Sequence, residues 1–115
     1  MNEKIEALRT ASEYILNLKN GINTAAENFQ TGNDEDGTNL VPLIADGINW
    51  VAQILELTKD VHKEEVNFDE LNNKLEELVE AIEFQDFILV GDLFQYEILP
   101  EIENMEKIIN KSLLN

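Results

Sequence analysis

The sequence predicts an all-α protein, an antiparallel up-down-up-down four-helix bundle whose last helix is kinked at Pro100. Two observations support this fold class. Apolar residues recur in steps of three and four along most of the 115 residues, which is the spacing of one helix face. Two prolines and five glycines leave few breaks, and short connections place consecutive helices antiparallel. The length fits one domain, residues 1–115.

The first predicted helix covers residues 3–31 and has the most regular pattern in the chain. Its apolar residues form a single heptad stripe, which predicts the core side of the helix. The stripe consists of Leu8, Ala11, Ile15, Leu18, Ile22, Ala25 and Phe29. Gly32 follows at the position where a left-handed residue ends a helix.

The second predicted helix runs from about Asn39 to Glu64, after a turn at residues 32–37. Pro42 then falls in its first turn, where a missing N–H costs little. Two apolar stripes merge into an arc of roughly 200°, wider than a surface helix needs. Gly47 lies on this apolar side, and close approach of a neighbouring backbone would offset its cost of about 1 kcal/mol relative to alanine.

The third predicted helix begins with a capping box, in which Asn67 is the N-cap and Glu70 its partner. Its two faces differ sharply. The apolar face carries Phe68, Leu71, Leu75, Leu78 and Ile82. The opposite face carries Asp69, Glu76, Glu80 and Glu83, which we interpret as solvated charge or as a field that steers a basic partner.

The fourth predicted helix starts at a cap on Asp86 and extends to about Leu114. Pro100 removes one backbone hydrogen bond inside it, so we expect a kink near residues 96–99. Gly91 lies on its apolar side and, like Gly47, predicts close approach of a neighbouring backbone.

Composition restricts the function more than any motif does. The net charge of −16 argues against binding to nucleic-acid phosphates or to an anionic membrane. The absence of cysteine excludes a disulfide framework, a zinc knuckle and a thiol nucleophile. The start lacks the apolar segment of a secretory signal, and no aliphatic or aromatic run approaches a membrane span. We therefore expect a cytoplasmic protein without membrane insertion.

The usual catalytic and metal-binding patterns do not fit this chain. Residues 32–37 resemble part of a calcium loop, but Gly32 and Leu43 stand where the essential carboxylates belong. A di-metal bundle needs paired Glu-x-x-His motifs, whereas His62 is the single histidine and we expect it to pack at a helix end. We predict no catalytic, metal or cofactor site, although 24 acidic residues leave a carboxylate pair open.

A surplus of apolar residues on the second and fourth helices predicts a partner-binding patch. One bundle face of the fourth helix leaves a second stripe uncovered, and two residues of the second helix extend it. The predicted patch comprises Trp50, Leu57, Leu89, Leu93 and Tyr96. Asp92 and Glu97 interrupt the apolar segment 87–99, either at its exposed margin or as buried or interfacial carboxylates that set specificity.

Two segments, ADGINWVAQILE (45–56) and DFILVGDLFQYEILPEIE (86–103), carry a resemblance to a known group. They resemble small acidic helical proteins of low-GC Gram-positive bacteria, some of them associated with motility genes, that have no assigned activity. The matching positions are Trp50, Asp92, Tyr96, Glu97 and Pro100. The acidic all-helical format is also similar to that of flagellar export chaperones, which wrap or cap helical partners.

The sequence therefore favours a non-enzymatic interaction module, a chaperone or adaptor that binds a helix of another protein in a setting such as motility or export. The partner is another protein or a second copy in a homodimer. The alternative is an acidic decoy or immunity-type inhibitor of a basic nucleic-acid-binding protein, suggested by the net charge. An enzyme or metal-binding bundle is the third interpretation.

Overall fold

The all-α prediction is confirmed by the computed structural model, which describes residues 2–114 apart from the side chain of Asn2 and contains no strand within them. The elements follow one another along the chain with short connections except after α2. They are α1 (Asn2–Gln30), α2 (Asp34–Leu57), the 3₁₀ turn η1 (Lys59–Val61), α3 (Asp69–Glu83), α4 (Phe87–Leu93), the π-helical η2 (Phe94–Ile98) and α5 (Leu99–Leu113).

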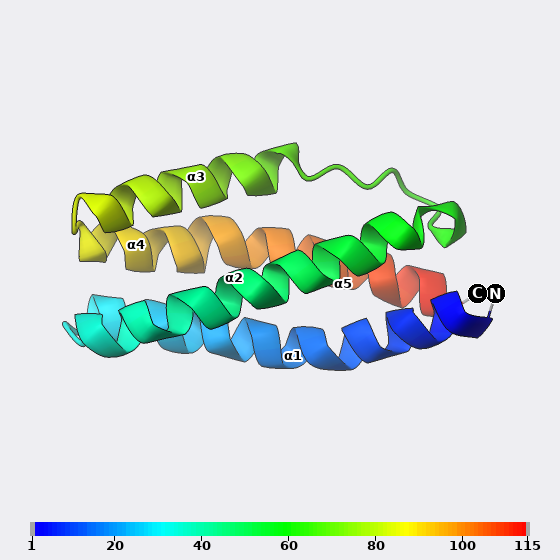
Figure 1. The fold of residues 1–115 in the computed structure, drawn as a ribbon, viewed down its shortest axis with the longest axis horizontal. Helices are drawn as coiled ribbons and strands as arrows, with labels where there is room; N and C mark the ends of the chain where they lie inside the picture. Colours follow the sequence, from blue (N-terminus) through cyan, green and yellow to red (C-terminus); the bar gives the residue numbers. More distant parts are fainter. Residues whose placement is uncertain (1, 115) are drawn as a thin grey trace.

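The bundle is organised around α1. This helix packs against α2 on one side and against α4, η2 and α5 on the other (Figure 1). The segments α4, η2 and α5 form one continuous rod, and α3 packs on its α4 and η2 part. The ends of the described chain lie close together at one end of the elongated molecule, which measures 45 × 23 × 18 Å.

The heptad stripe of α1 forms the centre of the core, as predicted. All seven of its members are buried, and Leu8, Ile15, Ile22 and Phe29 are completely inaccessible. The ring of Phe29 stacks on those of Phe87 and Phe94, with centroids 5.8 Å and 6.3 Å apart. The core therefore connects the end of α1 with the start of the α4–α5 rod.

The predicted bounds of the second helix are wrong at both ends. The turn is limited to residues 31–33, with Gly32 in the left-handed region at φ 85°, and α2 already begins at Asp34. Three acidic residues at 34–36 stabilise the positive end of the helix dipole, and Gly37 packs on the ring of Phe29. Pro42 consequently lies inside α2 instead of in its first turn.

At its other end α2 stops at Leu57, seven residues before the predicted end. The hydroxyl of Thr58 donates a 2.7 Å hydrogen bond to the carbonyl of Ile54, which also accepts the Thr58 N–H, so Thr58 closes the last turn of α2. After η1 the chain is extended at His62, with φ −87° and ψ 142°. An 11-residue connection, 58–68, thus separates α2 from α3.

The predicted cap of the fourth helix is confirmed, since the Asp86 side chain accepts a 3.3 Å hydrogen bond from the backbone N–H of Leu89. The predicted capping box of the third helix is wrong, because α3 begins at Asp69 with Phe68 as its N-cap residue and no side-chain cap hydrogen bond. The Asn67 side chain instead accepts a 2.8 Å hydrogen bond from the backbone N–H of Asp69, two residues further on. The irregularity expected near Pro100 takes the form of the π-helical segment η2, which ends directly before α5. Such single-turn π segments absorb an interrupted hydrogen-bond ladder without ending the helix.

Helix α2 is long and apolar enough to cross a membrane by length and composition alone. Core helices pass the same test, and α2 buries Ile44, Ile48, Val51 and Leu55 in the bundle. We therefore interpret α2 as a core helix of a compact globular fold.

The close backbone contact predicted at both glycines is present at Gly91, whereas at Gly47 the close neighbours are side chains of α1. A Cβ on Gly47 would meet the Tyr14 hydroxyl and lie 3.1 Å from Leu18 Cδ1. A Cβ on Gly91 would lie 3.1 Å from Phe29 Cβ and 3.2 Å from the backbone oxygen of Ala26. Helix α1 therefore approaches both neighbours at positions without a side chain.

The different surroundings of Gly21 and Gly91 predict opposite effects of a glycine-to-alanine substitution on stability. Gly21→Ala should stabilise the protein by about 1 kcal/mol, because its nearest neighbour would be Ile44 Cγ1 at 3.8 Å and alanine favours a helix. Gly91→Ala should destabilise it by about 1 kcal/mol or more, because overpacking against a backbone outweighs the same propensity gain. Urea unfolding followed by circular dichroism measures both, and equal shifts of the two midpoints would contradict the close contact.

Candidate functional site

The residues of the predicted partner-binding patch are not gathered in one place. Leu57, Leu89 and Tyr96 are 72%, 42% and 65% exposed. Trp50 is half-buried and packs edge-on against Tyr14, with ring centroids 5.2 Å apart. Leu57 ends α2 at one end of the molecule, whereas α4 lies at the other end (Figure 1). The five residues therefore do not form a continuous patch.

The expectation that Leu93 lies on an uncovered stripe is wrong. Its side chain is only 6% exposed and belongs to the core. The reason is that α4 is contacted on two sides, by α1 and by α3, instead of on one. The uncovered side of α4 carries Ile88 and Leu89 instead, with Ile88 60% exposed.

The two carboxylates within the apolar segment lie at its exposed margin and are not buried. Asp92 is exposed. Glu97 forms an ion pair of 3.4 Å with Lys74 of α3, and this hydrogen-bonded carboxylate raises the pKa of Lys74. Glu97 thereby helps to hold α3 against the α4–α5 rod.

A surface groove lies along α5, on the part of the α4–α5 rod that α3 does not cover. Its walls are residues Glu64–Leu71 of the connection and of the first turn of α3, together with residues of α5 and the following Leu114, from Glu101 onward. We call it the α5 groove; its volume is about 800 Å³. Figure 1 shows the extended connection spanning this half of the molecule, while α3 covers the other half.

The α5 groove has an apolar floor and an acidic rim. Met105 and Leu71 are buried at its base, and Val66, Phe68 and Ile108 are half-buried and packed on the core. Its charged residues are predominantly acidic. They are Glu64, Glu65, Asp69, Glu70 and Glu101, against Lys107 and Lys111.

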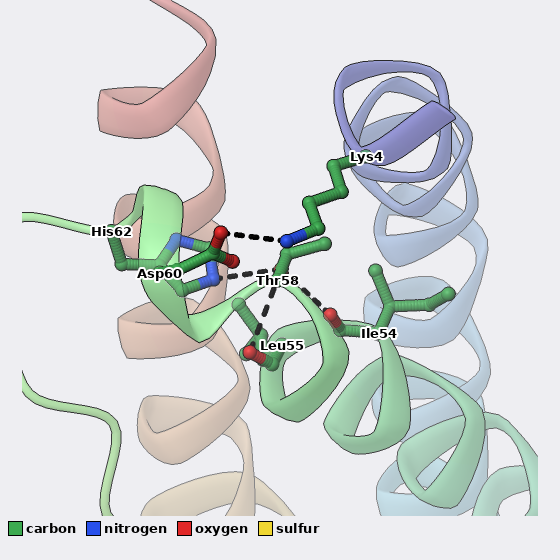
Figure 2. A network of polar contacts seen from close by, with 6 residues as sticks. All are labelled: Lys4, Ile54, Leu55, Thr58, Asp60 and His62. Carbon is green, nitrogen blue, oxygen red and sulfur yellow. Dashed lines mark hydrogen bonds and ion pairs between the residues drawn. The ribbon is translucent and has the colours of Figure 1, made fainter. Parts of the chain in front are cut away.

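The wall of the groove is fastened to the rest of the bundle at η1 and His62. His62 Nε2 lies 2.9 Å from Thr58 Oγ1, and His62 Nδ1 lies 2.6 Å from Ser112 Oγ on α5. Lys4 of α1 forms a 2.6 Å ion pair with Asp60 in the same junction (Figure 2). Lys111 of α5 pairs with Glu64 at the start of the extended connection. These contacts fix the connection at its first residues, and Asn67 fixes it at its last.

The hydroxyl groups on either side of His62 also have backbone carbonyls within reach. Thr58 Oγ1 donates to the Ile54 carbonyl and so accepts from Nε2–H, whereas the single Ser112 hydroxyl proton lies within reach of both His62 Nδ1, at 2.6 Å, and the Ile108 carbonyl, at 3.0 Å. A neutral imidazole is satisfied when the Ser112 hydroxyl donates to Nδ1, the shorter of these two contacts. Burial of the ring lowers the pKa of His62, against the opposing effects of the Leu55 backbone and of the Asp60 carboxylate.

The lowered pKa predicts a loss of stability in mild acid. Below about pH 6.5 the unfolded chain binds a proton at His62 more readily than the folded chain, so the free energy of unfolding falls as the pH decreases. Melting temperatures of the wild type and of His62→Gln, measured from pH 7.5 to 5.5, isolate this effect from the shared carboxylates. The advantage of the wild type should shrink with acid, and a constant or growing advantage would contradict the assignment.

Sequence reasoning missed the α5 groove because it extended the second helix through Glu64. Val61 continues the apolar stripe of α2 four residues after Leu57, which made that extension look regular. The available signal was the group of residues with weak helix propensity, Thr58, Asp60, Val61 and His62, in the last predicted turns.

The fold and the groove define an all-α bundle in which α3 covers only the α4 and η2 part of the rod and leaves the α5 groove beside it. Residues 6–108 match the model of the family described as a domain of unknown function, DUF8042. The chain belongs to this family, since the match covers most of its length. Comparisons with curated proteins and with solved structures give no match. Within residues 2–114, no three His, Asp or Glu side chains are placed to hold a metal ion together.

Proposed function

We propose that this protein is a non-enzymatic interaction module, a chaperone or adaptor that binds a helical segment of another protein. The observation that carries the proposal is the α5 groove, an apolar-floored groove beside an extended connection in a bundle made of helices. Helix-in-groove recognition uses such a surface to take the apolar face of an amphipathic helix.

Accessible apolar side chains elsewhere are consistent with this function. Phe84, Ile88, Tyr96 and Leu57 are each at least 60% exposed on the chain alone. Large apolar residues exposed in groups indicate interaction surfaces more often than isolated ones do. Phe84 and Ile88 lie close in sequence at the turn between α3 and α4, so a long helical partner has a second contact region available. We place this activity in the cytoplasm, in a setting such as motility or export.

Affinity purification followed by reconstitution tests the proposal. The tagged protein is recovered from cells of its source organism, and any captured protein is purified separately and recombined with it. We expect a defined complex that survives about 1 M NaCl, because apolar burial is not screened by salt. The bound segment should gain helical circular dichroism. Recovery of the protein alone, or a complex with an unstructured segment, would contradict helix binding.

A second candidate function is that of an acidic decoy for a basic nucleic-acid-binding protein. The outward side of α3 favours it, since Asp69, Glu76, Glu80 and Glu83 are all exposed. Such a complex would depend mainly on Coulombic attraction, which salt screens over about 10 Å at 0.1 M. Dissociation of the reconstituted complex between 0.1 and 0.5 M NaCl would support the decoy function over the adaptor function.

A further inference from the structure

Helix α3 is about half as long as α1, so it leaves the α5 part of the rod uncovered. Helix α1 has 29 residues and α3 has 15, which correspond to about 43 Å and 22 Å at 1.5 Å per residue. Because α3 covers only the α4 and η2 part of the rod, α5 is left with the extended connection beside it. A helix of about 14 residues would complete the fourth position of the bundle.

The side chains of the groove suit one face of such a helix. Phe68 of the connection and Ile108 of α5 both line the groove and are half-buried, and the buried Met105 lines it as well. Asn67 and Asn104 are exposed and add polar groups to the lining. The groove can therefore take apolar residues at every third and fourth position, while the outer face of the helix stays in solvent.

The charges of the rim determine the class of occupant. Five carboxylates face two lysines, and one of those lysines, Lys111, is paired with Glu64. The chain itself has a net charge of −16, so a second copy would bring further negative charge to an acidic rim. A helix with lysine or arginine beside its apolar stripe is complementary.

We infer that the α5 groove binds a basic amphipathic helix of about 14 residues from a partner protein, which lies between the connection and α5 beyond the start of α3. This inference rests on the proposed function and specifies the site and the chemistry of the partner. The helix places its apolar stripe between Phe68 and Ile108, and its basic residues lie against Glu65, Glu70 and Glu101.

Binding of a defined peptide tests the site. The probe is a fluorescein-labelled, 14-residue leucine–lysine peptide with an amphipathic pattern and no tryptophan, measured by fluorescence anisotropy. A leucine–glutamate peptide of the same pattern and a scrambled leucine–lysine peptide are the reference probes. We expect binding of the first peptide only, with a shift of ¹⁵N resonances in residues 64–71 and 101–114 and no change in the emission of Trp50, which lies outside the groove.

Two variants of equal charge separate the groove from general attraction. Glu65→Lys/Glu70→Lys alters the rim, and Glu76→Lys/Glu83→Lys alters the side of α3 outside it. Each double substitution changes the net charge from −16 to −12. The rim variant should raise the Kd by about tenfold, and the control variant by less than about threefold.

The outcomes distinguish this inference from the proposed function. Equal weakening by both variants, or equal binding of the scrambled peptide, would overturn the groove as the site. Changes centred on Tyr14 and Trp50 would also overturn it, while leaving helix binding by another surface intact. Resonances of the groove that shift with protein concentration in the absence of peptide would assign the groove to a second copy and overturn the partner. If no peptide binds but a partner protein still forms a stable reconstituted complex, the inference of a basic helical partner is rejected and the proposed function is kept.

Discussion

Leu93→Glu is expected to unfold the protein or nearly so, with a loss of about 4 kcal/mol or more in the free energy of unfolding. The side chain of Leu93 is 6% exposed, between helices that contact α4 on two sides. The substitution removes about 1.5–3 kcal/mol of apolar burial and adds a carboxylate that is costly to bury without a partner. Small domains have about 5–15 kcal/mol of stability in total, so most of it would be lost.

The pH dependence of this variant provides an independent check. A buried glutamate has a raised pKa, so the folded variant binds a proton that the unfolded chain has released at neutral pH. Its deficit relative to the wild type should therefore shrink as the pH falls from 7 towards 5. Urea unfolding at both pH values measures it, with Leu89→Glu as the control on the same helix at a 42% exposed position. Two variants of equal, near-native stability would mean that Leu93 faces solvent.

The difference between Leu93 and the stripe of α1 shows which features a sequence can specify. The seven apolar residues of α1 repeat without interruption, and any neighbour packed on that helix must cover them. In α4, apolar residues surround the helix almost completely, so the pattern does not select a face. Which face of α4 is buried depends on where α3 packs against it, and this packing is a feature of the tertiary structure.

The groove depended on where α2 ends, which periodicity does not describe. Capping by Asp86 was predictable, because the interaction involves a neighbour three residues away, whereas α3 begins at Asp69 without the predicted cap on Asn67. The connection after α2 also involves a distant contact, since His62 bonds to Ser112 on α5, 50 residues away. A sequence pattern alone could not show this contact, which ties the connection to α5.

The presence of an acidic surface was predictable, whereas its position relative to the α5 groove was not. The sequence predicted an acidic face of the third helix, made of Asp69, Glu76, Glu80 and Glu83. In the structure Asp69 lines the α5 groove, whereas Glu76 and Glu83 lie outside it. The proposed function therefore depends on the connection between α2 and α3 more than on the patch predicted on the second and fourth helices.

Phe29→Ala is expected to cost about 3–5 kcal/mol, because it removes a completely buried ring from the point where three segments meet. The ring stacks on Phe87 and Phe94, and a Cβ on Gly37 would lie 2.9 Å from its edge. Phe84→Ala, at a 78% exposed position, is the matched control and should change the stability by less than about 0.5 kcal/mol.

A double-mutant cycle tests whether the Phe29 ring itself explains the glycine at position 37. Gly37→Ala should destabilise the wild type, because the ring occupies the space of the new methyl group. In the Phe29→Leu background the same substitution should cost less, with a coupling of about 0.5–3 kcal/mol between the two sites. Urea unfolding of the four proteins measures the coupling. Additive effects would mean that the ring does not occupy that space, and a loss below about 1 kcal/mol for Phe29→Ala would remove it from the core.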